Sequence, residues 1–144
     1  MTQTIFVLNG PNLNLLGTRE PAIYGSDTLD DIAGMLEDRA QELGLVVDVR
    51  QSNHEGHLID WMHEAQATGV KAIIINAGAY THTSIALYDA AKSIKVPVIE
   101  VHLSDPLTRE PFRHISYIGM AAVKEFKGQG PKGYVLALEH AATL

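Results

Sequence analysis

Short apolar runs alternate with helical patterns along the chain, and this alternation limits the possible fold more than any other feature of the sequence. The runs are rich in Val and Ile and are bounded by turn residues, so we expect them to form strands. They cover Thr4 to Leu8, Leu45 to Arg50, Ala72 to Asn76 and Val96 to Val101, with a weaker fifth strand near Ala121 to Phe126. Strands that alternate with helices are joined by right-handed crossovers, which favours a parallel sheet covered on both faces.

The segments between the runs have the start and stop signals of helices. Thr28 to Leu43 places apolar residues at helical spacing, with Asp27 as the expected N-cap and Gly44 as the stop. The other three expected helices cover Glu55 to Thr68 before Gly69, Ser84 to Lys95 before Pro97, and Pro131 to Ala142. The pattern predicts an α/β protein with a flavodoxin-like, doubly wound five-stranded parallel sheet in the order 2-1-3-4-5. At 144 residues without a linker or repeat, we expect one domain over 1–144.

Composition excludes several classes of protein. The chain has no cysteine, which excludes disulfides, thiolate catalysis and Cys-ligated zinc. No apolar run approaches the roughly 20 residues of a membrane span, and no secretion signal opens the sequence, so we expect a cytoplasmic protein without a membrane partner. The net charge of −6 and the scattered basic residues argue against a nucleic-acid partner.

Polar residues follow three of the expected strands at the point where each strand ends. In the order 2-1-3-4-5 these three strands are neighbours, so their carboxyl ends share one crevice. The residues are Asn9, Asn12, Asn14, Arg19 and Tyr24 after the first strand, Asn76, Tyr80, Thr81, His82, Thr83 and Ser84 after the third, and Glu100, His102, Ser104 and Asp105 at the fourth. Such a crevice suits a small, oxygen-rich ligand.

Glu100 and His102 lie two residues apart, so they face the same side of their strand. A carboxylate can then hold one imidazole nitrogen while the other faces the crevice, which is the arrangement of an acid/base histidine. The segment from His82 to Ser84 precedes a helix, where free N–H groups favour an anion or a hydroxyl. Capping of the helix is the alternative role for Ser84.

Tyr24 can act as a base only if the pKa of its phenol falls below the ordinary value of about 10. Arg19 lies in the same loop, and a guanidinium within about 4 to 6 Å lowers a pKa by roughly one to three units. Gly17 and Gly25 flank this segment and would let the loop fold over a bound ligand.

Five motifs resemble those of the type II 3-dehydroquinate dehydratases, and they occur in that family's order through nearly the whole chain. The motifs are NGPNLNLLGTREP at 9–21 with Tyr24-Gly25, QSNHEG at 51–56, NAGAYTHTS at 76–84, EVHLS at 100–104 and REPFRH at 109–114. The resemblance implies dehydration of 3-dehydroquinate to 3-dehydroshikimate through an enolate, with no cofactor and no metal. It also implies a homododecamer built from trimers.

The resemblance further implies a role for each matching residue. Tyr24 would remove the proton alpha to the ketone, Arg19 would polarise Tyr24, and His102, beside Glu100, would protonate the departing hydroxyl. Asn12 would steady the enolate through a water. The matching substrate-binding positions are Asn76, His82, Leu103, Ser104 and Arg113, together with Asp89, which would reach the site of a neighbouring subunit.

Two other readings of the sequence remain open. The first is a flavin- or nucleotide-binding module, although the first loop lacks G-x-G-x-x-G and a P-loop lysine. The second is an oligomeric binding protein of the same fold without catalysis. A metal site at His54, His57 and His63 is disfavoured, because their spacing is not that of the zinc peptidases. Imine chemistry is disfavoured too, because no lysine falls in the three polar clusters.

Overall fold

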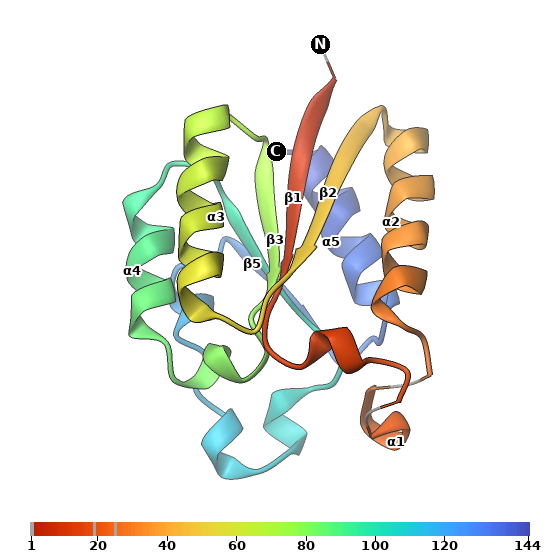
Figure 1. Cartoon of the computed structure of the whole chain (residues 1–144), viewed down its shortest axis with the longest axis vertical. Helices are drawn as coiled ribbons and strands as arrows, with labels where there is room; N and C mark the ends of the chain where they lie inside the picture. The colour runs from red at the N-terminus through yellow and green to blue at the C-terminus, as the bar shows by residue number, and fades with distance from the viewer. Residues whose placement is uncertain (1, 19, 25) are drawn as a thin grey trace.

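The protein is an α/β structure built on one sheet of five parallel strands in the order β2-β1-β3-β4-β5 (Figure 1). The computed structural model describes residues 2–18, 20–24 and 26–144, with the backbone alone at Tyr24. The strands are β1 (Gln3–Asn9), β2 (Leu45–Gln51), β3 (Ala72–Asn76), β4 (Val98–His102) and β5 (Lys124–Lys127). The predicted fold class and strand order are confirmed.

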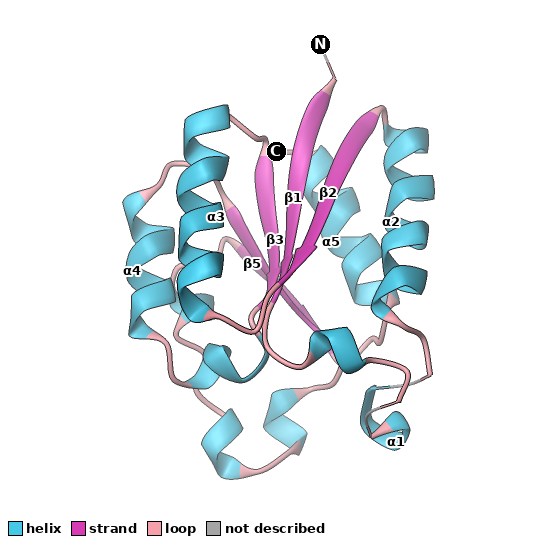
Figure 2. Ribbon diagram, in the orientation of Figure 1, coloured by secondary structure: helices cyan, strands magenta, loops and turns pink. Residues whose placement is uncertain are grey.

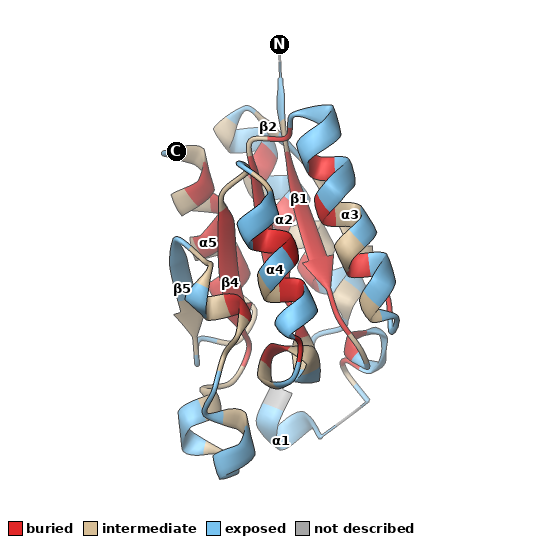
Figure 3. Ribbon diagram, turned by 90° about the vertical axis from the view of Figure 1, so that its left-hand side faces the viewer, coloured by how far each residue is buried: buried red, intermediate tan, exposed pale blue. Residues whose placement is uncertain are grey.

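Helices cover both faces of the sheet (Figures 1 and 2). Along β1 the side chains alternate, so that Ile5 and Val7 pack towards one face while Phe6 and Leu8 pack towards the other. The first face is covered by α2 (Leu29–Leu43) and α5 (Lys132–Ala142), and the second by α3 (Glu55–Thr68) and α4 (Ile85–Ser93). The central strands are therefore buried on both sides, whereas the edge strand β5 is largely open (Figure 3).

The carboxyl ends of the central strands lie at the same edge. Asn9 pairs with Gln51 on one side and with Asn76 on the other, so β1, β2 and β3 end side by side. Short helical turns gather beyond this edge, below the strand arrows in Figure 2. They are η1 (Leu13–Leu15), α1 (Pro21–Tyr24), η2 (Gly78–His82), η3 (Pro106–Thr108) and η4 (Pro111–Arg113). The turn η5 (Ile118–Met120) instead packs beside α4, where the chain returns to the start of β5. Among the residues that the structure describes, no helix is both long and apolar enough to cross a bilayer.

Some boundaries differ from those expected. The N-cap of α2 is Thr28 and not Asp27, because Thr28 and Asp31 satisfy each other's backbone N–H groups in a capping box. The strand β5 begins at Lys124, because Ala121 and Ala122 instead donate their N–H groups to Ile118 at the end of a turn.

The ends of β4 and α4 also shift from the expected ranges. The strand β4 begins at Val98, one residue after Pro97, which has no N–H to donate to the ladder. The helix α4 ends at Ser93, and Ser84 precedes it as the N-cap, accepting from Leu87 N at 2.9 Å. The capping role expected as the alternative for Ser84 is therefore the observed one.

Candidate active site

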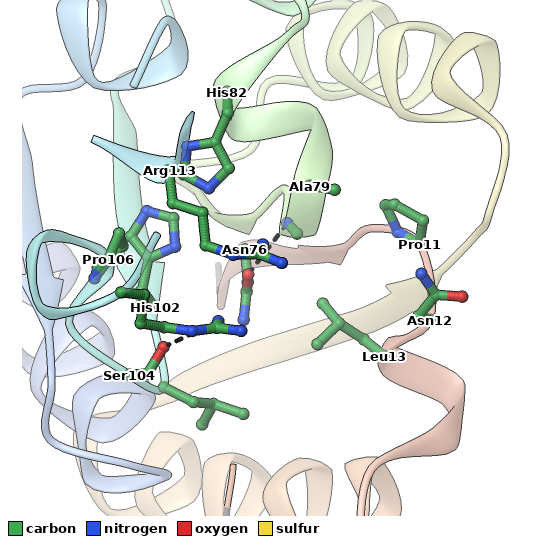
Figure 4. A pocket seen from close by; sticks show the side chains of 13 residues that line it. Pro11, Asn12, Leu13, Asn76, Ala79, His82, His102, Ser104, Pro106 and Arg113 are labelled. Atoms are coloured by element: carbon green, nitrogen blue, oxygen red, sulfur yellow. Dashed lines mark hydrogen bonds between the residues drawn. The ribbon is translucent and has the colours of Figure 1, made fainter. Parts of the chain in front are cut away.

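An open cleft lies at the carboxyl edge of the sheet, between the loops that follow β1, β3 and β4 (Figure 4). Its volume is about 590 Å³, including the space at its mouth, which suits a small ligand. The expected site residues that line it are Asn12, Asn76, His82, His102, Leu103, Ser104 and Arg113. The strand order thus brings the three polar clusters of the sequence into one site.

A buried hydrogen bond to a carboxylate supports the histidine of the cleft. His102 Nε2 donates to Glu100 Oε2 at 2.6 Å, so Nδ1 is the ring nitrogen left for other partners. Ser116 Oγ also donates to Glu100 Oε2. Glu100 does not line the cleft; it lies fully buried behind His102 and orients the imidazole from there. The expectation that the two side chains share one face of the strand is confirmed.

The carboxylate of Glu100 is stabilised by its neighbours against the effect of burial. Burial opposes its ionisation, but the hydrogen bond and the charge of His102, with the hydrogen bond from Ser116, hold the pKa of Glu100 below its usual range. An ionised Glu100 is an acceptor only, so it fixes the Nε2–H of His102 in place and leaves Nδ1 towards the cleft.

His82 stands across the cleft from the β1 loop and favours the neutral state. Its Nδ1 donates to the carbonyl of Ile115 at 2.8 Å, because a carbonyl can only accept. Partial burial lowers the pKa of His82, outweighing the opposite effect of that hydrogen bond. Nε2 of the neutral ring is then a hydrogen-bond acceptor, which suits a ligand hydroxyl.

The loop after β1 is held by the residues that follow β2. Asn12 has φ of 70°, the left-handed region, and donates its N–H to Asn53 Oδ1 at 2.9 Å. Gln51 Nε2 donates to the carbonyl of Gly10 at 3.1 Å and to Asn53 Oδ1 at 3.2 Å. The motif QSNHEG therefore has a structural role at this site, because it fixes the backbone that carries Asn12.

Two arginines give the cleft positive charge. Arg113 is predicted from the sequence to bind substrate, whereas Arg109, in the same REPFRH motif, is not predicted to belong to the site; both line the cleft. Arg109 Nη1 approaches Ser104 Oγ at 3.5 Å, and Arg113 Nε donates to Glu110 Oε1 at 3.0 Å. The R-x-x-x-R spacing was the signal that could have identified Arg109. Paired guanidinium groups suit a carboxylate ligand.

Not every expected site residue is found among the described residues that line the cleft. Asp89 lies on the exposed side of α4, and the residues described around the cleft do not include it. Arg19, Gly25 and the side chain of Tyr24 lie outside the described residues. The backbone segment before Tyr24 can be located, since Ala22 and Ile23 line a surface hollow together with Ser104 and Arg109.

Several other polar residues of the sequence motifs have structural partners. His57 Nδ1 and Ser52 Oγ are 2.7 Å apart, and His114 Nε2 donates to the carbonyl of Arg109 at 3.1 Å. Asp105 caps η3 by accepting from Leu107 N. Over the part of the chain that the structure describes, no three His, Asp or Glu residues gather as metal ligands would.

Comparison with known proteins agrees with this architecture. The family model for dehydroquinase class II matches residues 3–142. The 3-dehydroquinate dehydratase of Rhizobium johnstonii is 58% identical over 138 residues, which is 96% of this chain and 94% of that protein.

Solved structures agree as well. The type II dehydroquinase of Butyrivibrio crossotus superposes with a TM-score of 0.95 at 42% identity, covering 97% of each chain. That of Propionibacterium acnes gives 0.95 at 44% identity, covering 100% of this chain and 99% of the other. On this match of sequence and structure over nearly its whole length, the chain belongs to the class II dehydroquinase family.

Proposed function

We propose that this protein dehydrates 3-dehydroquinate to 3-dehydroshikimate, in the shikimate pathway or in quinate breakdown, through an enolate and without a cofactor. The observation that carries the proposal is the cleft itself, which joins the buried Glu100–His102 pair to two guanidinium groups and to side-chain amides. A carboxylated, hydroxylated ring ketone needs an anion site, hydroxyl partners and an acid for the leaving group. The cleft offers all three.

His102 is the general acid of the proposed mechanism. Its Nε2–H donates to Glu100, and the protonated ring carries a second proton on Nδ1. That proton passes to the hydroxyl as the C–O bond breaks, so the leaving group departs as water. The negative charge of Glu100 stabilises the imidazolium before transfer and fixes the direction of the ring.

Tyr24 is the proposed base, and Arg19 lowers its pKa. The phenolate takes the proton alpha to the ketone, and the electron pair of that C–H bond forms the enolate. The enolate then expels the hydroxyl and becomes a conjugated enone. Support comes from the position of α1, because Ala22 and Ile23, just before Tyr24, lie beside the loop of Ser104 and Arg109.

The other residues bind substrate and steady the intermediate. Asn12 holds the enolate oxygen through a water, as an oxyanion partner must. Asn76, His82, Arg113 and the backbone at Leu103 and Ser104 bind the carboxylate and the hydroxyls, and we add Arg109 to this group.

The assembly proposed for the active enzyme is a homododecamer of trimers. Asp89 reaches the site of a neighbouring subunit in that arrangement, which agrees with its exposed position on α4. Apolar side chains that face solvent on and near η4 and η5 support burial of this surface between subunits. They are Phe112, Ile115, Met120 and Val123.

A direct assay tests the proposal, since the conjugated enone of the product absorbs in the ultraviolet. Wild-type protein should raise this absorbance when 3-dehydroquinate is added. We expect Tyr24→Phe and Arg19→Ala to lower kcat by roughly a hundredfold or more while the fold is retained, because each removes a transition-state interaction. Tyr88→Phe, on α4, is the matched control and should keep normal turnover.

The acid role of His102 has its own test. His102→Ala should lose turnover to a similar degree, and a substrate with a better leaving group should recover part of the loss, because it needs less protonation. Absence of any recovery would assign His102 to binding alone. Near-normal turnover of Tyr24→Phe would dismiss Tyr24 as the base.

A further inference from the structure

The hydroxyl of Tyr134 lies in a buried hydrogen-bond chain behind the cleft, far in sequence from the residues that it joins. Tyr134 is near the start of α5 and is fully buried against the sheet. Its hydroxyl donates to Asn9 Oδ1 at 2.7 Å and accepts from Asn76 Nδ2 at 3.0 Å. One phenol thus connects the final residues of β1 and β3.

Backbone groups at both ends fix which groups donate and which accept along this chain of hydrogen bonds. The N–H of Gly78 donates to Asn76 Oδ1 at 3.2 Å, and Asn9 Nδ2 donates to the carbonyl of Arg50 at 3.1 Å. A peptide N–H can only donate and a carbonyl can only accept, so neither amide can be turned over. Between them a group is needed that accepts from Asn76 and donates to Asn9, which a phenol does.

Only one of the two amides reaches the cleft. Asn76 lines it, at the centre of the view in Figure 4, whereas Asn9 is fully buried and is not among the described residues of its lining. One N–H of Asn76 Nδ2 is used by Tyr134, and one lone pair of Oδ1 is used by Gly78. The second N–H and the second lone pair are left for a ligand.

We propose that Tyr134 is a positioning residue for substrate binding, which holds the Asn76 carboxamide so that its second N–H is presented to an oxygen of the substrate. This rests on the proposed function, in which Asn76 contacts substrate. Without the hydroxyl, Asn76 Nδ2 faces an apolar ring and loses its acceptor, so only the Gly78 N–H still holds the amide and its orientation is less well fixed. Burial also raises the pKa of Tyr134, so the hydroxyl keeps its proton and both of its hydrogen bonds at neutral pH.

Tyr134→Phe tests the proposal, because it removes the hydroxyl and keeps the ring in the core. Asn76 binds substrate before and during the reaction alike, so we expect KM to rise roughly three- to tenfold while kcat changes less than about twofold. In an Asn76→Ala background the same substitution should change KM by less than about twofold, because the amide that it positions is gone. An equal rise of KM in both backgrounds would overturn the proposal, and so would no rise in the wild-type background.

Leu138→Val is the control for a general loss of stability. Leu138 is buried on the same helix, and its truncation should weaken the core without touching the hydrogen-bond chain. Its KM should equal that of wild type at a temperature where all variants are folded. If Leu138→Val raises KM as much as Tyr134→Phe does, Tyr134 acts only through stability and the proposal fails.

Hydrogen exchange at the Asn76 side chain gives a readout that needs no activity. By NMR on the wild-type protein, one of the two Nδ2 protons should exchange slowly and the other fast, since one is held by buried Tyr134 and the other faces the cleft. Fast exchange of both protons would overturn the positioning role even if the enzyme is active. If the wild-type protein does not turn over 3-dehydroquinate, the proposed function fails, and this measurement still decides whether Tyr134 holds the amide.

Discussion

Glu100 and His102 lie on the same face of β4, and Glu100 Oε2 accepts the Nε2–H of His102 at 2.6 Å. The pair is buried, and Ser116 adds a second hydrogen bond to the same carboxylate oxygen. The imidazole therefore has one orientation, with Nδ1 available on the side away from Glu100. Three of the predictions below follow from this arrangement.

Glu100→Gln should lower kcat by roughly ten- to a hundredfold and leave KM within about twofold, because the amide keeps the size of the side chain but cannot stabilise the imidazolium. Steady-state kinetics with 3-dehydroquinate measure this. Glu37→Gln, the same substitution at an exposed position of α2, should match wild type. A normal kcat in Glu100→Gln would show that the charge of Glu100 is not needed by His102.

Gly119→Ala should disturb the same carboxylate from behind. A Cβ at this position would lie 2.7 Å from Glu100 Oε1 and 2.7 Å from Ser116 Oγ, so both side chains or the backbone at Gly119 have to shift. We expect a lower kcat and a loss of about 1 to 3 kcal/mol in the free energy of unfolding, as overpacked sites show. Urea unfolding together with the assay measures both.

Gly34→Ala is the matched control for that substitution. Gly34 lies in α2, and a Cβ there meets no atom within 4 Å. Alanine should stabilise the helix by up to about 1 kcal/mol and leave kcat unchanged. If Gly119→Ala left kcat and stability as high as Gly34→Ala does, the close packing around Glu100 would not be needed for activity.

Ser116→Ala should alter how stability depends on pH. The pKa of Glu100 lies below its ordinary value of 4.5, although burial acts against this, because His102 and Ser116 stabilise the carboxylate. A lowered pKa contributes stability that is present above 4.5 and is lost as the pH falls through the lower, folded-state value. Removing Ser116 Oγ should cost about 1 to 3 kcal/mol at neutral pH.

The difference between wild type and Ser116→Ala should shrink as the pH falls through the folded-state pKa of Glu100, which lies below 4.5, because the carboxylate that Ser116 stabilises then takes up a proton. Denaturant unfolding at a series of pH values gives this difference directly. Ser116→Thr keeps the hydroxyl and serves as the comparison. A difference that stays constant across the pH range would mean that Ser116 stabilises the fold without acting on Glu100.

The fold and the framework of the site follow from local patterns in the sequence. The Val- and Ile-rich runs indicate the central strands, since strands buried on both faces are apolar throughout. The spacing of Glu100 and His102 indicates their contact, because side chains on a strand repeat with a period of two. The boundaries expected for the edge strand β5 were wrong because they followed an apolar run. The strand itself, KEFK, has no such run, and the apolar residues just before it form a turn.

The residues that hold the site from behind cannot be predicted from a local sequence pattern. Ser116 reaches Glu100 from a turn 16 positions further along the chain, and Tyr134 reaches Asn9 across 125 positions. Such contacts depend on how the helices and turns pack on the sheet, which no spacing within one element reports. The roles of Gln51 and Asn53 escaped prediction likewise, because they bind another loop and not a ligand.

The start of α2 allows the expected cap and the observed cap to be compared by experiment. Thr28→Ala should cost about 1 kcal/mol in the free energy of unfolding, because Asp31 N–H loses its acceptor, and Thr28→Ser should recover most of that cost. Asp27→Ala should change stability by less than about 0.5 kcal/mol, as an exposed position without a capping contact does. Thermal and urea unfolding of the three variants measure these changes. A larger loss of stability for Asp27→Ala than for Thr28→Ala would show that Asp27 is the N-cap.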